Sequence, residues 1–287
     1  MSDIEKFLAS KSVSLPGQPL DLSAAFATPR VNRGYMIVMT GRSGSTWLAT
    51  ALSQLNGFGN PREYFSEVVL PHQWKFEEAQ DFSDVFCGVV DKYSDNGCFG
   101  FKINPHRLFA LSRLVDVKAT FSGTNFSWID MRRWNLVKQA LSFAVAKKSG
   151  VWHDFQNSQK KAAPETKPSE VDVSDADLWT EILHIVGQEQ ALEQFFLQNN
   201  IHPLRIYYEE IFDSKSALLT RVCHFIRPEA QPDIASVTDG TAKLDKSVYS
   251  AREQAFTVKF AGVLNNIYSA RAHLTPAEIK QQIAAYA

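Results

Sequence analysis

Cysteine is scarce in this chain, which has only three in 287 residues: Cys87, Cys98 and Cys223. They are odd in number, far apart in the sequence, and form no Cys-x-x-Cys motif. This spacing argues against a disulfide framework and a zinc site, and it fits a protein of a reducing compartment. We expect all three to be buried free thiols.

Long apolar runs are also absent, as is an excess of charge of either sign. No stretch approaches the ~18 apolar residues of a membrane span, and residues 1–22 carry acidic side chains where a signal peptide needs a basic start. Thirty Lys and Arg against thirty-one Asp and Glu leave a formal charge of −1, so no overall positive field favours nucleic acid. We expect a cytoplasmic protein without a membrane span or a nucleic-acid partner.

The chain does contain enough apolar material for a large core, since 45% of its residues are hydrophobic. Short apolar runs predict four strands, at 35–39, 98–103, 126–131 and 204–208. Residues 47–55 and 136–145 each follow a predicted strand and have apolar side chains at helical spacing. This alternation predicts an α/β fold with a central, mostly parallel sheet flanked by helices, which binds ligands at the carboxyl ends of its strands.

One segment, at about 153–177, interrupts this pattern. It has few large apolar residues and many Lys, Glu, Ser and Pro residues, so it predicts a long polar loop. Loops of this length are uncommon unless they form a lid, a binding loop or a linker. Because no internal repeat or second composition accompanies it, we expect residues 1–287 to form a single domain that carries this loop.

The turn after the first predicted strand has the sequence TGRSGST at residues 40–46. Gly41 and Gly44 permit close approach to the backbone, and the first N–H groups and the dipole of the next helix form a cradle for phosphate or sulfate. Further donors come from four polar side chains: Arg42, Ser43, Ser45 and Thr46. The alternative is that the glycines only make a tight strand-to-helix turn.

The nucleotide P-loop competes with this interpretation, but it needs a lysine directly after its last glycine. Ser45 stands at that position, and the basic residue, Arg42, precedes Gly44. The cradle therefore suits an anion other than a magnesium-bound γ-phosphate. Two alternatives stay open: a small-molecule kinase with a degenerate P-loop, and a non-catalytic module that binds an anion or a nucleotide.

The sequence GRSGSTWL at 41–48 resembles the 5′-phosphosulfate loop of sulfotransferases that use 3′-phosphoadenosine 5′-phosphosulfate (PAPS). The sequence GFGNPREYF at 57–65 is similar to a stretch of their bacterial branch, typified by the trehalose 2-sulfotransferases. The resemblance implies a P-loop NTPase-like sulfotransferase fold, PAPS as donor, 3′-phosphoadenosine 5′-phosphate (PAP) as product, and no metal requirement. It implies cofactor contacts from Arg42, Ser43, Gly44, Ser45, Thr46 and Trp47.

These sulfotransferases hold the 3′-phosphate of PAPS with an arginine at a strand end and a serine on the next helix. Arg133 and Ser142 resemble that pair. Arg132 is the adjacent alternative, and because successive strand residues point to opposite sides, we expect only one of the two arginines to reach the phosphate. A solvated arginine, and a serine bonded to its own helical turn, are the non-functional alternatives.

Sulfuryl transfer to a hydroxyl needs a base for the acceptor proton and cations that neutralise the leaving phosphate. The resemblance implies Glu63 as the base, while the alternative is a surface carboxylate paired with Arg62. Rival bases are three histidines, His72, His106 and His153. We rank His106 first among them because it follows a predicted strand.

Positive charge near the leaving group is assigned to Arg42, while Lys102 either reaches the sulfuryl group or is a solvated charge. Residues 243–256 occupy the place of a late basic loop over the cofactor, with Lys246, Ser247 and Arg252 as candidate contacts. The glutamates of YYEEIF, at 207–212, are expected to support structure.

The acceptor is less defined by the sequence than the donor. The resemblance implies a small-molecule or glycolipid acceptor, with a carbohydrate hydroxyl as the sulfated group, and it allows a homodimer. Four aromatic residues either stack on sugar faces or belong to the core: Tyr64, Phe65, Trp74 and Trp152.

Overall fold

The computed structural model describes residues 2–66, 79–123, 125–152, 167–238, 247–271 and 276–284. The chain divides into two compact units. We call one the sheet unit, made of Met1–Met39, Gly44–Arg132 and Phe196–Gly240, and the other the helical unit, made of Thr40–Ser43, Arg133–Phe195 and Thr241–Ala287. The organisation of the chain as a single domain stays a prediction.

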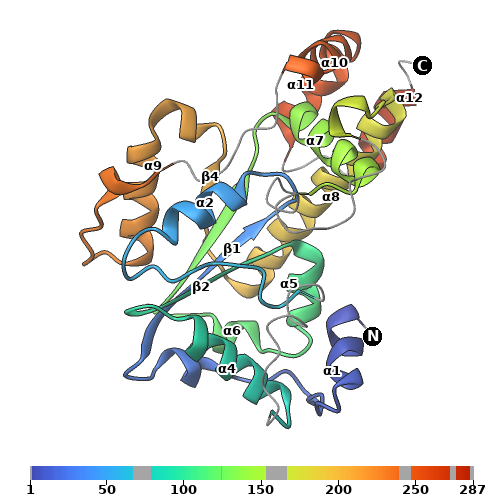
Figure 1. The fold of residues 1–287 in the computed structure, drawn as a ribbon. Coiled ribbons are helices and arrows are strands. Elements are labelled where there is room, and N and C mark those ends of the chain that lie inside the picture. Colours follow the sequence, from blue (N-terminus) through green and yellow to red (C-terminus); the bar gives the residue numbers. More distant parts are fainter. Residues whose placement is uncertain are drawn as a thin grey trace. The chain divides into compact units, whose positions relative to one another are not determined.

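The sheet unit contains a four-stranded sheet in the order β2-β1-β3-β4 (Figure 1). Its strands are β1 Val31–Met39, β2 Gly97–Ile103, β3 Phe126–Arg132 and β4 Leu204–Tyr207. Every pair of neighbours is parallel, and the four strands match the four predicted runs to within a few residues at each end. The predicted α/β fold with a parallel sheet is confirmed.

Strands β1, β2 and β3 are buried along most of their length, as is typical of parallel sheets covered by helices, whereas only Ile206 of β4 is buried. All seven residues of β3 are buried, and so are the last six of β1. The register pairs Met39 with Met131 and Arg132 with Tyr207, so the carboxyl ends of the strands share one edge. β2 lies on one side of β1, and β3 and β4 lie on the other, so the direction in which strands are added reverses at β1. Sheets of this type bind ligands at the carboxyl ends of the strands where this reversal occurs.

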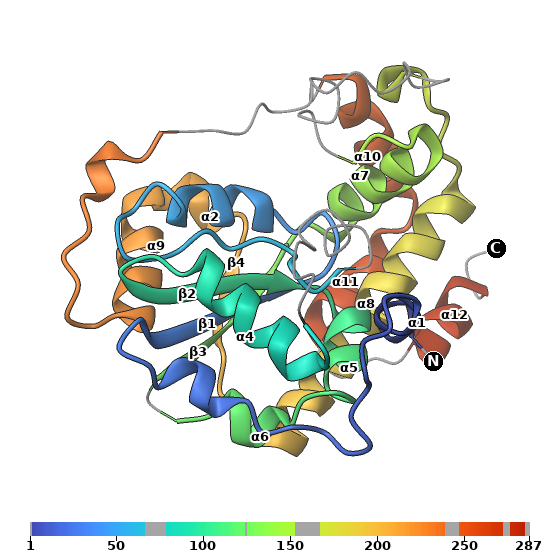
Figure 2. The same ribbon diagram turned by 60° about the horizontal axis from the view of Figure 1, so that its bottom comes forward.

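One face of the sheet is covered by α2 Ser45–Leu52 and α9 Glu210–Ile226 (Figure 2). Side chains of these helices pack with inward residues of the strands in one apolar cluster, including Leu48, Leu52, Ile37, Ile129 and Leu219. The predicted helix at 47–55 is confirmed, although α2 ends at Leu52 and Leu55 is buried in the turn beyond it.

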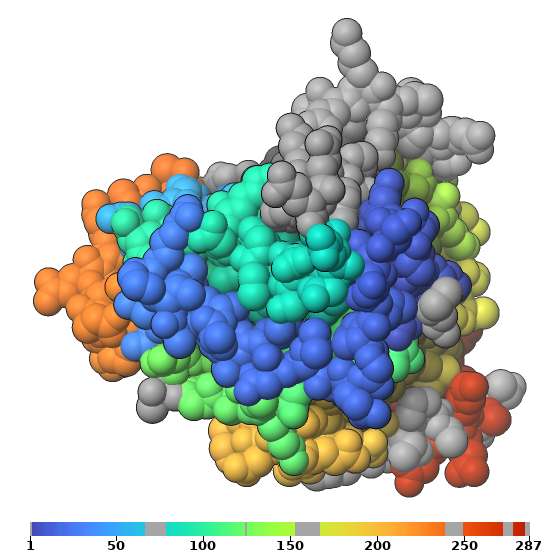
Figure 3. All heavy atoms as spheres, turned by 90° about the horizontal axis from the view of Figure 1, so that it is seen from below, coloured from blue at the N-terminus to red at the C-terminus, as the bar shows by residue number. Residues whose placement is uncertain are grey.

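The opposite face carries α4 Phe82–Tyr93 and α6 Val117–Thr120, and α5 Pro105–Leu111 follows β2 (Figure 2). Its core is strongly aromatic, with ring contacts among Phe26, Phe86, Phe99, Phe121 and Phe126. The N-terminal segment, with α1 Asp3–Ser10 and the short helix η1 Ser23–Phe26, lies alongside α4 (Figure 3). Backbone hydrogen bonds from Ser14 to Gln80 and from Leu20 to Leu114 hold it there.

In the part of the helical unit that the structure describes, the regular elements are helices. They are α7 Leu136–Ser149, η3 Pro168–Glu170, most of α8 Asp175–Asn199, α10 Ser247–Lys259, α11 Ala261–Ala270 and α12 Pro276–Ala284. Apolar faces of α7, α8, α10 and α11 share one core, in which Leu141, Ile182, Phe256 and Leu264 are each at most 2% exposed. The predicted helix at 136–145 is confirmed as part of α7.

Two sequence-based expectations need correction or limitation. Cys98 and Cys223 are buried, and burial raises the pKa of each thiol to about 12, but Cys87 is exposed. The prediction of three buried thiols was therefore wrong for Cys87, which lies on the outer surface of α4. Of the polar segment at 153–177, residues 153–166 lie outside the described residues, and α8 begins before the segment ends, at Asp175.

Candidate active site

Gly44 ends the turn after β1 and is the N-cap of α2. Its φ of +89° lies in the left-handed region, which glycine adopts more readily than any other residue. A Cβ atom at this position would lie 2.0 Å from the Cδ2 atom of Tyr208, which directly follows β4. Both the backbone conformation and the tyrosine ring therefore require glycine here.

Gly44→Ala is expected to lower the free energy of unfolding by about 2–5 kcal/mol, because left-handed backbone costs ~1–2 kcal/mol and overlap with a packed ring ~1–3 kcal/mol. Gly123→Ala is the matched control, since Gly123 has a φ of +81° and no atom within 4 Å of the added Cβ. Urea unfolding of both variants measures the difference. Equal losses would show that the Tyr208 ring moves aside without cost.

Four polar residues of the sheet unit contact one another near the carboxyl end of β2. We call them the Glu63 group: Thr46, Glu63, Lys102 and Arg107. Lys102 Nζ donates to Thr46 Oγ1 at 3.1 Å and lies 3.5 Å from Glu63 Oε1. Arg107 Nη1 donates to Glu63 Oε2 at 2.7 Å. Glu63 thus lies between two cations, and Lys102 connects it to the first turn of α2.

The backbone around Glu63 runs beside β2, which explains this placement. Arg62 forms a parallel bridge with Phe101, and the Lys102 N–H donates to the Arg62 carbonyl at 3.0 Å. The Arg62 side chain bonds instead to Asn60, at 3.3 Å. The alternative of a surface carboxylate paired with Arg62 is therefore wrong, because the partners of Glu63 are Lys102 and Arg107.

Tyr64 and Phe65 anchor the same segment in the core. The Tyr64 ring stacks on Tyr93 with centroids 4.4 Å apart, and the Phe65 ring stacks on Phe86 at 5.3 Å. Both residues are at most 2% exposed. They are core residues and do not present a face for stacking on a sugar, while Trp74 lies outside the described residues.

Lys102 is a buried cation and not a solvated charge, since only 8% of the residue is exposed. Burial lowers the pKa of its ammonium group, and the nearby Glu63 carboxylate partly opposes this shift by charge and hydrogen bonding. An ammonium held in this way is a strong electrostatic group, because the surrounding protein screens it less than water does. The sequence left its role open, and the structure places it between Thr46 and Glu63.

Arg107 is the member of the Glu63 group that the sequence did not single out. The Asn104 side chain caps α5 by accepting from the Arg107 N–H at 2.9 Å. Side chains of successive helix residues point about 100° apart. Because the Arg107 side chain points toward Glu63, the side chain of the preceding residue, His106, points in another direction. His106 is exposed, whereas His72 and His153 lie outside the described residues. Asn104 followed by Pro105 is typical of a helix start, and this pattern could have placed Arg107 on a helix from the sequence alone.

In the helical unit, three residues of the two predicted anion-binding sites contact one another. We call them the Arg42 group: Arg42, Arg133 and Ser142. Arg42 Nε donates to Ser142 Oγ at 2.9 Å, and Arg133 Nη1 donates to the Arg42 carbonyl at 3.4 Å. The Arg42 guanidinium also donates to the carbonyl of Trp152. Two turns that are far apart in the sequence therefore meet at Arg42.

Helix α7 holds the backbone of the first turn. The fully buried Gln139 donates its Nε2 to Thr40 Oγ1 and to the Gly41 carbonyl, each at 2.8 Å. The Phe143 ring packs so close to Gly41 that a Cβ atom there would lie 2.2 Å from it. Arg42 follows with a φ of +63°, which is uncommon for a residue with a side chain. The turn is thus held in a conformation that it would not adopt alone.

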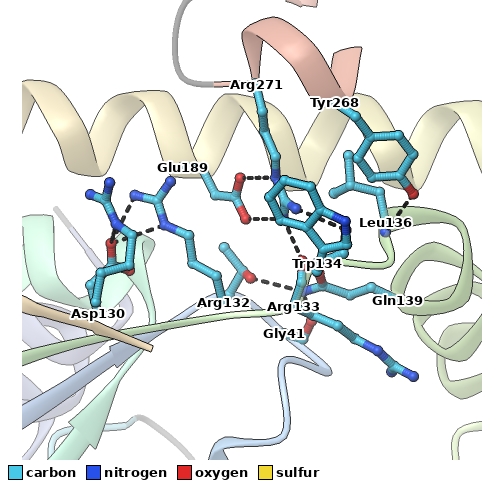
Figure 4. A network of polar contacts seen from close by, with 12 residues as sticks. Gly41, Asp130, Arg132, Arg133, Trp134, Leu136, Gln139, Glu189, Tyr268 and Arg271 are labelled. Carbon is cyan, nitrogen blue, oxygen red and sulfur yellow. Dashed lines mark hydrogen bonds and ion pairs between the residues drawn. The ribbon is translucent and has the colours of Figure 1, made fainter. Parts of the chain in front are cut away.

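The two adjacent arginines at the end of β3 have different partners (Figure 4). Arg132, 3% exposed, donates Nε and Nη2 to Oδ2 of Asp130 at 2.9 and 2.8 Å, within the sheet unit. Arg205 donates to the same oxygen at 2.9 Å. Arg133 belongs to the helical unit and bonds to Arg42. Arg132 is therefore committed to a structural ion pair, which leaves Arg133 as the candidate for phosphate binding.

The remaining residues of the first turn differ in their surroundings. Ser43 is fully buried, and its Oγ has no hydrogen-bond partner among the residues that the structure describes. Ser45 is 6% exposed at the start of α2. Trp47 is 8% exposed and packs in the apolar cluster of the sheet unit, so its ring supports α2 from the core side.

The later candidates are partly described. Lys246 lies outside the described residues. Arg252 donates to the Val173 carbonyl at 2.7 Å and to Asp175 at 2.6 Å, so it connects α10 to the start of α8. Glu210 accepts from the Tyr207 N–H at 2.7 Å and pairs with Arg221 at 2.6 Å, which confirms a structural role for this glutamate.

A cavity of about 570 Å³ in the sheet unit is separate from the Glu63 group. It is lined by residues 54–57, which follow α2, by Asn96, which directly precedes β2, and by six residues between 227 and 236, which follow α9. It therefore lies toward the amino end of β2, whereas Lys102 is near the carboxyl end. Polar groups there bond to one another, as when Arg227 donates to the carbonyls of Gly57 and Asn96.

The described residues contain neither a candidate membrane span nor a candidate metal site. Among them, no helix combines the length and the apolar character that crossing a bilayer requires. Within the same part of the chain, no three His, Cys, Asp or Glu side chains gather in an arrangement that could hold a metal ion.

Comparison with known proteins identifies the family. A model of the Stf0 sulphotransferase family matches residues 104–252, which is more than half of the chain. The match includes Arg107, Arg133 and Ser142, and it begins after Glu63 and Lys102. No curated protein matches the chain in a sequence comparison. From the extent of the family match, the chain is an enzyme that belongs to the Stf0 sulphotransferase family.

Proposed function

We propose that this enzyme transfers the sulfuryl group of PAPS to a hydroxyl of a carbohydrate or glycolipid acceptor. Membership of the family implies PAPS as the donor. The observation that carries the assignment of residues is the Arg42 group. Resemblance assigns Arg42 to the phosphosulfate turn and Ser142 to the pair that holds the 3′-phosphate, and their side chains are 2.9 Å apart within the helical unit.

The residues present fit a donor with two separate anionic groups. Arg42 and Arg133 carry guanidinium groups, which match phosphate and sulfate oxygens in charge and geometry. The buried Ser43 hydroxyl lacks a hydrogen-bond partner among the described residues and is available to an anion. Gly44 is the N-cap of α2, so the first N–H groups of that helix lie beside the turn and can donate to an anion. We assign Arg133 and Ser142 to the 3′-phosphate, and residues 42–46 to the phosphosulfate.

PAPS, when bound, supplies a sulfuryl group on a good leaving phosphate. In our proposal Glu63 takes the proton from the acceptor hydroxyl as it attacks sulfur. A carboxylate has about four lone-pair positions, so the contacts with Lys102 and Arg107 leave room for a hydroxyl. Those two cations orient Glu63, and Lys102, bonded to Thr46, places positive charge at the first turn of α2.

Several finer parts of the proposal rest on resemblance and on placement. His106 is the alternative base. It is exposed on α5, and this exposure favours Glu63 over His106 as the group that takes the proton. We further propose that the reaction needs no metal, that the enzyme works in the cytoplasm, and that it forms a homodimer. The residues that bind the acceptor are expected near Glu63, because the proton acceptor must touch the attacking hydroxyl.

A thermal melt with PAP tests the donor assignment. At 100 times its dissociation constant, a ligand that binds only the folded state adds ~2.7 kcal/mol of stability, so the melting temperature should rise measurably. ATP with magnesium is the control ligand, and EDTA is added to the PAP sample. A rise with ATP and magnesium alone would indicate a kinase-like site, and no rise with PAP would refute the proposal.

A further inference from the structure

We infer that Arg271 and Glu189 are positioning residues for the turn that carries Arg133. This inference rests on the proposed function, because it assigns Arg133 to the 3′-phosphate. Arg271 follows α11 and Glu189 lies on α8, both within the helical unit. Together they hold the backbone of residues 133–134, and so set the preference for a nucleotide with a 3′-phosphate.

The contacts are direct and involve every nitrogen of the Arg271 guanidinium (Figure 4). Nε and Nη2 donate to the two carboxylate oxygens of Glu189 at 2.7 and 2.6 Å. Nη2 also donates to the Arg133 carbonyl at 2.7 Å, and Nη1 donates to the Trp134 carbonyl at 3.0 Å. One side chain thus binds two successive carbonyls while a carboxylate fixes its own orientation.

Burial makes this arrangement more than a surface ion pair. The side chain of Arg271 is 7% exposed and that of Glu189 is 1% exposed. The planar fork of Arg271 makes four hydrogen bonds, two to the carboxylate and one to each carbonyl, whereas a lysine ammonium has only three N–H groups on a single nitrogen. The geometry therefore points to a requirement for arginine, and not only for positive charge, at position 271.

The same turn is held from a second side at the start of α7. The Leu136 N–H donates to the Tyr268 hydroxyl at 3.1 Å (Figure 4). Asn135 donates to Glu253 at 2.7 Å. Asn135 also caps α7 by accepting from the Lys138 N–H at 2.8 Å. Helices α10 and α11 thus fix the residues that follow Arg133, as Arg271 fixes Arg133 itself.

A rigid backbone matters here because Arg133 must present its guanidinium in one direction. Its Nη1 bonds to the Arg42 carbonyl, which belongs to the other anion-binding turn. A small displacement of a binding group can cost much of its affinity. Arg271 lies outside the residues that match the family model, so the match itself assigns it no role.

The test replaces the whole pair with apolar residues of similar size, Arg271→Met/Glu189→Met, because removal of one partner alone would leave a buried unpaired charge that strongly destabilises the fold. Titration calorimetry then compares PAP with AMP, which lacks the 3′-phosphate. We expect the ratio of the dissociation constants, AMP over PAP, to fall about tenfold or more. Arg271→Lys should lose the same preference, since it keeps the charge without the fork.

Two further measurements separate positioning from general stability. Lys148→Met is the matched control, because Lys148 also bonds a carboxylate and a carbonyl in the helical unit, those of Asp177 and Asp172. It should leave the ratio unchanged. In an Arg133→Ala background, the Met pair should lower the ratio no further, because both changes act through one side chain.

The outcomes distinguish this inference from the proposed function. If the wild-type enzyme does not prefer PAP to AMP, the proposed function fails. If the wild type prefers PAP and the folded Met pair keeps that preference, the positioning role is wrong while the proposed function stands. Equal proportional losses of affinity for PAP and AMP would likewise overturn the inference.

Discussion

Glu63→Gln is expected to lower kcat by about 10²–10⁴-fold while the dissociation constant of PAP stays within about twofold of the wild-type value. The amide keeps an oxygen that can accept from Arg107, so the local structure should persist. It cannot take a proton at neutral pH, so the acceptor hydroxyl would lose its base. Steady-state kinetics and calorimetry with PAP separate the two effects.

Controls for this result come from the same unit. Glu210→Gln removes a carboxylate that pairs with Arg221, and it should change stability but not kcat at saturating substrate. His106→Asn should be nearly neutral. If Glu63→Gln kept full activity and His106→Asn lost it, the base would be His106.

The pH dependence provides a further check on the Glu63 group. Burial lowers the pKa of Lys102, and Glu63 opposes that shift, so removal of the carboxylate should lower this pKa further. Any loss of activity that follows deprotonation of Lys102 should therefore begin at a lower pH in Glu63→Gln than in the wild type. A shift to higher pH would show that Glu63 does not stabilise the ammonium form.

The fold was predictable where apolar residues gather in short runs. All four strands followed from such runs, because strands covered by helices are mainly apolar, with few polar residues such as Asp130 and Arg132 of β3. Helix α4 was less accessible to this reasoning, since its sequence mixes β-branched residues, a glycine and a cysteine that faces solvent. The position of the N-terminal segment along α4 depends on backbone hydrogen bonds, such as that from Ser14 to Gln80, which leave no local pattern in the sequence.

The candidate site was predictable in its residue types but not in its contacts. The two anion-binding turns could be found from glycine, serine and arginine next to strands and helices. That Arg42 donates to Ser142 could not, because the contact joins residues far apart in the chain. Arg107 was missed because the choice between neighbours on a short helix depends on rotation, and the sequence does not specify which side chain meets Glu63.

Arg271 illustrates a more general limit of sequence reasoning. A single arginine after a helix resembles many solvated arginines, and neither its neighbours nor its spacing indicates a role. Only the structure reveals that it is 7% exposed and bonded to the carbonyls of Arg133 and Trp134. Residues that hold a backbone in place thus escape motif analysis, because their partners are peptide groups that every residue has.

Arg133→Ala is expected to raise the dissociation constant of PAP by about 10–100-fold, as the loss of one charged hydrogen-bonding contact costs ~1.5–3 kcal/mol. Binding of AMP should change much less, because the group that Arg133 contacts in our proposal is the 3′-phosphate. Arg42→Ala should weaken both ligands, since that residue belongs to the phosphosulfate turn. Calorimetry with each ligand measures the two effects.

Arg132→Met is the matched comparison, because Arg132 is the neighbouring arginine with a different partner. Its loss breaks a buried ion pair with Asp130 and should lower the free energy of unfolding by about 3 kcal/mol. Arg205 still pairs with Asp130, so the folded protein should persist and bind PAP with unchanged affinity. If Arg132→Met weakened PAP binding and Arg133→Ala did not, the two arginines would have to exchange roles, and the contact of Arg133 with Arg42 would be structural only.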